Sequence, residues 1–274
     1  PRDWSSDVCS SDLYKTDAVR HWSTDDTWPD GWLAAAPAMK KPRGTAPALA
    51  AALAASEPGT IDRPIGQSTG SHALIQTLPL ALLTAPGEER LAAEIAALTH
   101  GGTEAWVTAV LAQRFTTSLR EGYSFSAALE IAVHSEVAEE LVRGTASSAL
   151  DEIRVLLHRL GDRDIVDRFI RDKTSEGTAL NAFAGGVVAY AVGRTDGSTK
   201  VLELASRGPS GASAVAGALV GLIHGVDALP LGLRINHELS HLAETLAIDA
   251  LIERGGGPRG EEESGLWWER YPGW

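Results

Sequence analysis

The chain has almost no cysteine, with Cys9 the single one among 274 residues. A disulfide framework needs paired cysteines and a thiolate metal cluster needs several, so both are excluded. Cys9 also lies in an N-terminal segment that we expect to be foreign to the native protein. Without disulfide or thiol chemistry to accommodate, a cytoplasmic location is the simplest expectation.

Basic side chains and long apolar runs are also scarce. Lys and Arg number 24 against 36 Asp and Glu, a formal charge of -12, which would repel phosphate backbones and argues against a nucleic-acid partner. The longest apolar run, Ala212–Ile223, is shorter than the about 20 residues that a membrane helix needs. We therefore expect no nucleic acid and no membrane among the partners of this chain.

Residues 1–13, PRDWSSDVCSSDL, do not look native. They match the translation of a common sequencing adapter, so we expect a cloning or assembly scar and set them aside, as one would a tag. On this interpretation the native N-terminus is missing.

Strand patterns are nearly absent, whereas apolar residues recur at spacings of three and four from Glu88 onward, with Gly, Pro, Ser and Thr between the periodic segments. The pattern predicts an all-α fold in which residues 14–253 form one compact multi-helix domain and residues 254–274 a linker with an aromatic tail. The expected helices cover approximately residues 46–55, 91–98, 106–115, 124–143, 150–160, 179–192, 200–206, 212–225 and 233–253, with Ser124 or Ser126 as a cap.

The stretch INHELSH, residues 235–241, contains the pattern H-E-x-x-H. Two histidines four residues apart share one helix face and can bind zinc, and the intervening Glu can act as a base, which makes a zinc-dependent peptidase using His237, Glu238 and His241 the alternative function. The periodicity argues against it, because these histidines fall opposite the apolar stripe and so face solvent. That stripe consists of Ile235, Leu239, Leu242 and Leu246.

Two stretches in the first half of the chain resemble motifs of one known family. STGSHALIQTLPLALL, residues 68–83, is similar to a loop of the form S-x-G-C-G-A-x-M-R-x-A-P-x-G-L, and AALTHGGTEAW, residues 96–106, to A-x-L-T-H-x-x-x-E-A. A third stretch, SRGPSGASAVAGALVGLIHGVDALP, residues 206–230, is similar to S-G-D-S-D-S-T-G-A-I-A-G-N-L-L-G-A-x-x-G-x-x-A-I-P. The terminal helix and the ending WWERYPGW fit the same order of motifs.

These motifs resemble the ADP-ribosylglycohydrolase family, all-α enzymes that use two Mg²⁺ ions to release ADP-ribose from protein side chains. The resemblance implies an orthogonal helical bundle and, as partner, ADP-ribose or an ADP-ribosylated protein. It also implies that the family's phosphate loop and nearby histidine correspond to ligand-binding residues here, namely Ser68, Gly70, Ser71, His72 and His100. For His100 a second interpretation stays open, a cation capping a helix C-terminus before Gly101.

The motifs depart from the family where its metals bind. Aligned without gaps, Gly208 and Ser210 stand at the two aspartates of the third stretch, and neither supplies a carboxylate. STDDT, residues 23–27, matches the family's other metal motif, T-D-D-T, so Thr24, Asp25 and Asp26 are candidate Mg²⁺ ligands, or else form an exposed Asp-rich turn. We expect at most one metal ion, a degenerate hydrolase with impaired or absent turnover, and no residue that can be assigned as catalytic.

Overall fold

The computed structural model describes residues 38, 46–82, 87–142, 177–236 and 239–253. Over these residues the secondary structure is helical, apart from one isolated antiparallel bridge between Gly70 and Thr178. The all-α prediction is confirmed. None of the described helices is long and apolar enough to cross a membrane. The expected helix over 150–160, the scar and the C-terminal tail lie outside the described residues.

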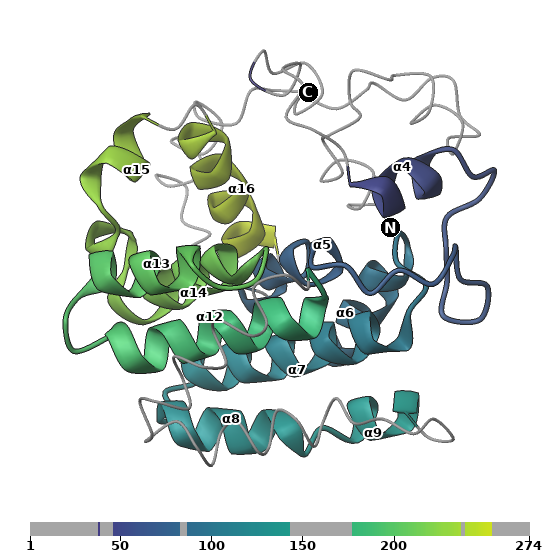
Figure 1. The fold of residues 1–274 in the computed structure, drawn as a ribbon, viewed down its shortest axis with the longest axis horizontal. Helices are drawn as coiled ribbons and strands as arrows, with labels where there is room; N and C mark the ends of the chain where they lie inside the picture. The colour runs from purple at the N-terminus through teal and green to yellow at the C-terminus, as the bar shows by residue number, and fades with distance from the viewer. Residues whose placement is uncertain (1–37, 39–45, 83–86, 143–176, 237–238, 254–274) are drawn as a thin grey trace.

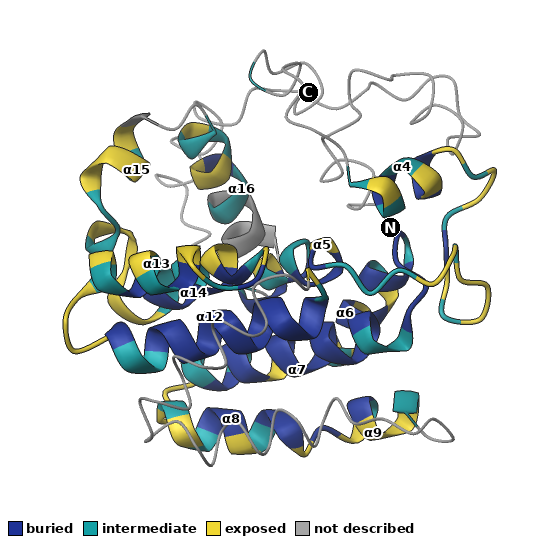
Figure 2. Ribbon diagram, viewed as in Figure 1, coloured by how far each residue is buried: buried dark blue, intermediate teal, exposed yellow. Residues whose placement is uncertain are grey.

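Three helices run side by side through the centre of the molecule: α7 (Thr103–Arg120), α12 (Ala179–Gly193) and α14 (Ala212–His224). Figure 2 shows α7 and α12 buried along most of their length, with α6 (Glu88–Ala97) against α7. Ala and Gly are frequent in α12, so its neighbours approach closely: a Cβ added at Gly186 would lie 2.5 Å from Val215 Cβ. The tight packing of α12 against α14 thus follows from small side chains at the contact.

The remaining helices surround this centre (Figure 1). Several begin at residues whose chemistry favours a helix start: Thr178 Oγ1 accepts from Asn181 N–H before α12, and Ser124 Oγ accepts from Ala127 N–H before α8. Ser124, rather than Ser126, is therefore the cap. The other elements are α4 (Pro47–Leu53), α5 (His72–Ile75), η3 (Leu78–Leu82), α8 (Phe125–Val133), α9 (Glu136–Val142), α13 (Ser198–Ser206), η4 (Val226–Ala228), α15 (Leu231–Asn236) and α16 (Ser240–Glu253).

Two helix predictions were wrong in length. The helix expected over 124–143 is divided into α8 and α9, because Ser135 Oγ accepts from Ala138 N–H and starts a new helix. The helix expected over 233–253 is divided into α15 and α16, in a stretch where Asn236 and Ser240 are residue types that favour helix ends. The apolar stripe expected there fails at Ile235, which is 67% exposed.

Candidate functional site

The central helices α7 and α12 begin at the same short segment, residues 68–71. Gly102 N–H, at the N-cap of α7, donates to Ser68 O at 3.0 Å. Ala179 N–H, the first of α12, donates to Thr69 O at 2.7 Å. One short segment therefore crosses the starts of two central helices and ties them together.

The third central helix, α14, starts at the same segment. Its N-cap Gly211 lies so close that an added Cβ would be 2.8 Å from Ser71 Cβ. The start of a helix carries a partial positive charge from the aligned peptide dipoles and suits anionic groups. Three helix starts on one segment make this end of the bundle favourable for a negatively charged ligand.

The segment is itself fastened to the protein. Ser71 N–H donates to Gly177 O at 3.0 Å, next to the bridge between Gly70 and Thr178, and Gly70 N–H lies 3.3 Å from Ser68 Oγ. Ser71 N–H is thus engaged within the protein. Ser71 is 3% exposed, Ser68 and Gly70 are half-buried, and the side chain of His72 is exposed at the start of α5. Ligand binding by these four residues stays a prediction.

His100 lies beside Gly70 and is 1% exposed. A Cβ added at Gly70 would be 3.3 Å from His100 Nε2, so the second motif stretch does meet the first. Burial, with a smaller effect from His72, lowers the pKa of His100 to about 4, and the ring is neutral at physiological pH. A neutral buried ring does not act as a cation at a helix C-terminus, so that second interpretation of His100 is not supported.

The hydrogen bonds around His100 favour one tautomer. Thr99 Oγ1 lies 2.8 Å from His100 Nδ1 and also accepts from Gln76 Nε2 at 3.2 Å. A hydroxyl that accepts from the amide is well placed to donate its own hydrogen to Nδ1, which leaves the ring proton on Nε2. His100 then presents an N–H donor on the side of Gly70. The backbone carbonyl of His100 is held in turn by Trp106 Nε1–H at 2.6 Å.

The third motif stretch reaches the same place through the loop before α14. A Cβ added at Gly177 would lie 3.6 Å from Ser210 Cβ, and Ser210 is exposed. Gly208 is half-buried two residues earlier in that loop. Of the two positions expected to correspond to the family's metal-binding aspartates, Ser210 is therefore beside Gly177 and offers a hydroxyl, whereas a Cβ added at Gly208 would meet Ala205 and Ala212.

The donors that the structure describes at this face do not suit a pair of Mg²⁺ ions. A binuclear magnesium site needs several carboxylates, because hard cations take oxygen ligands that also balance their charge. Over the residues with a described placement, no group of three or more His, Cys, Asp or Glu side chains could hold a metal ion. Thr24, Asp25 and Asp26 lie outside those residues, so their role as ligands stays a prediction.

The zinc interpretation gains no support from the described part of HELSH. His241 is exposed in the first turn of α16, and His237 and Glu238 fall outside the described residues.

Reasoning from the sequence missed two residues at this face. Thr178 pairs with Gly70 and caps α12; its position just before an apolar helical run was the available signal. Glu104, in the first turn of α7, has a buried Oε1 without a hydrogen-bond partner in the described structure, and its carboxylate suits the helix start. Only the fold shows that both are near the segment 68–71.

These observations define an all-α protein in which three central helices begin at one short segment. The family model for ADP-ribosylglycohydrolase matches residues 9–259, most of the chain, and the protein belongs to that family. Members of the family typically bind Mg²⁺, and membership suggests an ADP-ribose-linked substrate. No curated protein and no solved structure matches the chain.

Proposed function

We propose that this protein binds ADP-ribose, free or attached to a protein side chain, and hydrolyses it poorly or not at all. The observation that carries the proposal is the meeting of three helix starts at residues 68–71, with Gly208 and Ser210 where the family has aspartates. Such a face retains its attraction for phosphate, while Glu104 alone among the residues described there supplies a carboxylate, too few for a pair of divalent cations.

The protein's own groups suffice to hold a diphosphate ligand. The dipoles of α7, α12 and α14 stabilise negative charge at their starts, and the absence of Asp at 208 and 210 removes a repulsion that Mg²⁺ would otherwise have to offset. His100 donates from Nε2 on the side of Gly70, in a dry environment where a hydrogen bond to a ligand is strengthened. Ser68 and His72 supply further polar side chains at the edge of the same segment.

Poor hydrolysis is expected because the site has too little negative charge to hold divalent cations. The family's reaction depends on cations that position the ribose and activate water, and a site short of carboxylates holds such ions weakly. The neutral His100 ring, with a pKa near 4, is a weak base and replaces neither function.

Calorimetric titration of the full chain with ADP-ribose, with and without Mg²⁺, tests the proposal. We expect saturable binding that Mg²⁺ does not strengthen, and no release of ADP-ribose from a modified protein at high protein concentration. Binding tightened tenfold or more by Mg²⁺, together with Mg²⁺-dependent release, would instead identify an active hydrolase. Absence of binding by a folded sample would reject the ligand assignment.

A pair of histidine variants makes the test specific to this site. His100→Leu removes the Nε2 donor, and we expect ADP-ribose binding to weaken by about tenfold, the effect of one lost hydrogen bond. His134→Leu makes the same change at an exposed histidine that follows α8, and its binding should equal that of the parent. Equal affinities for both variants would exclude His100 from the binding site.

A further inference from the structure

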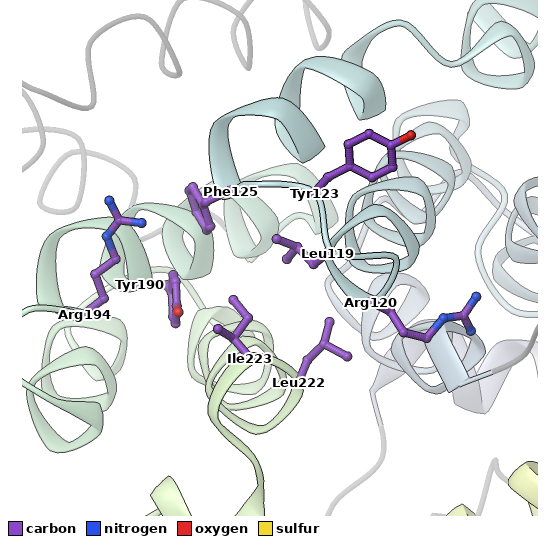
Figure 3. A pocket seen from close by; sticks show the side chains of 8 residues that line it. All are labelled: Leu119, Arg120, Tyr123, Phe125, Tyr190, Arg194, Leu222 and Ile223. Atoms are coloured by element: carbon purple, nitrogen blue, oxygen red, sulfur yellow. The ribbon is translucent and has the colours of Figure 1, made fainter.

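A cavity of about 350 Å³ lies at the other end of the three central helices. It is formed where α7, α12 and α14 end and α8 begins, about 27 Å along α7 from the segment 68–71. Figure 3 shows Leu119, Leu222 and Ile223 on one side of a common space and the rings of Phe125 and Tyr190 on the other. None of the residues proposed above to bind ADP-ribose lines this cavity.

The aromatic side of the cavity is an ordered stack. The rings of Phe125 and Tyr190 are stacked with centroids 5.3 Å apart and an interplanar angle of 22°. His224 stacks behind Tyr190 at 5.9 Å and 27°, and its Nε2 lies 2.8 Å from Tyr190 Oη. Burial raises the pKa of Tyr190, which keeps the phenol neutral. Because the ring faces are covered by one another, by His224 and by Arg194, the stack presents fixed ring edges to the cavity, and a flat ligand can pack its own face against them.

The charges around the cavity are of one sign. Arg120 and Arg194 line it, the Arg194 guanidinium 5.7 Å from the Phe125 ring centroid and Arg120 Nη1 donating to Ala81 O, and no acidic side chain among the described residues lines it. In a chain of net charge -12 this is an unusual local excess of positive charge. Both arginines lie at helix C-termini, where they also offset the negative ends of the helix dipoles, so a test must separate that role from ligand binding.

We propose that this cavity is a second binding site, which takes a small aromatic carboxylate with its ring between Ile223 and the Phe125–Tyr190 stack. The carboxylate lies toward Arg194, whose planar guanidinium pairs well with that group. Aliphatic side chains and aromatic rings with a few polar groups at the edge are the usual composition of a small-molecule site, and the cavity volume is at the lower end of the usual range.

The probes are 2-naphthoate and its neutral analogue 2-naphthamide, titrated into the full chain by calorimetry or ligand-observed NMR. We expect naphthoate to bind about tenfold more tightly than naphthamide, since the two share the ring and differ in the charge that Arg194 pairs with. ADP-ribose should not compete. No saturable binding of either probe, equal affinities, or competition by ADP-ribose would overturn the proposal.

Two variants with a matched control complete the test. Arg194→Gln should abolish the preference for naphthoate and leave naphthamide binding unchanged. Ile223→Trp should fill the cavity and weaken both probes, whereas Ile235→Trp, on the exposed α15, should bind both like the parent. If Arg194→Gln lowers thermal stability but keeps the preference for naphthoate, Arg194 only offsets the helix dipole and the proposed carboxylate site is wrong.

Discussion

His100 is buried, is hydrogen-bonded through Nδ1, and lies beside the segment proposed to bind the ligand. Its ring is enclosed between Thr99 and Gly70, and the chain uses it in the neutral form. A buried neutral imidazole is a donor of fixed direction at physiological pH, but it makes the folded state sensitive to acid.

We expect stability to fall as the pH drops from about 6.5 toward about 4. In this interval the unfolded chain takes up a proton on His100 and the folded chain does not, so the stability present above pH 6.5 is lost as the pH falls. One pKa unit corresponds to about 1.36 kcal/mol, so the total loss in the free energy of unfolding is up to about 3 kcal/mol. Chemical denaturation at pH 7 and pH 5 measures the difference. His100→Gln should show a smaller loss over this range than the parent; an equal loss would assign the effect to other groups.

At the scale of an element, the N-cap glycine of α14 and one glycine inside the helix have opposite roles. Gly211 caps the helix at φ +92°, and a Cβ there would lie 2.8 Å from Ser71 Cβ. Gly221 lies inside the helix, and a Cβ there would meet nothing within 4 Å. Glycine is required at 211 because the positive φ and the short distance to Ser71 leave no room for a side chain. At 221 glycine lowers the stability of the helix, and no neighbouring atom requires it.

Alanine substitutions should separate these roles. Gly211→Ala forces both the backbone and Ser71 to shift and should lower the free energy of unfolding by about 2 kcal/mol, with weaker ADP-ribose binding. Gly221→Ala should raise the free energy of unfolding by up to about 1 kcal/mol and leave ADP-ribose binding unchanged. Urea unfolding of both variants gives the comparison, and a neutral Gly211→Ala would show that α14 does not approach the segment as described.

The break between α8 and α9 leads to a prediction of its own. Ser135 is 4% exposed; its Oγ accepts from Ala138 N–H at 3.2 Å and donates to Glu89 Oε2. Ser135→Ala should cost about 1 to 2 kcal/mol, because a helix cap is lost and a carboxylate loses a donor. Ser126→Ala, an exposed serine within α8, is the control and should be nearly neutral; similar costs in urea unfolding would contradict the capping role.

At the scale of the whole molecule, net charge governs behaviour. With 36 acidic against 24 basic residues and a pI near 5.1, the protein should be retained by anion exchange at pH 7 and show no shift of duplex DNA in a gel at low salt. Its solubility should be lowest near pH 5, where net charge vanishes. A DNA shift that weakens as salt rises would reveal a basic surface that the composition hides.

The helical class and most helix positions could be predicted, because a period of 3.6 residues is a local property of the chain. The starts at Ser124 and Thr178 are likewise local, since a side chain two or three residues away satisfies the backbone. The divisions at Ser135 and before Ser240 were missed because apolar periodicity continues across them. At Ser135 a competing local hydrogen bond, which periodicity does not register, starts a new helix.

By itself the sequence determined an all-α protein of acidic charge, the motifs that resemble the ADP-ribosylglycohydrolase family, and the absence of aspartate at 208 and 210. Only the tertiary structure decided that residues 68–71, His100, Thr178 and the start of α14 meet at one face, and that Tyr190 and Phe125 stack at the other. The physical reason is that these neighbours are far apart along the chain. Their proximity depends on how closely helices rich in Ala and Gly pack, which no local pattern records.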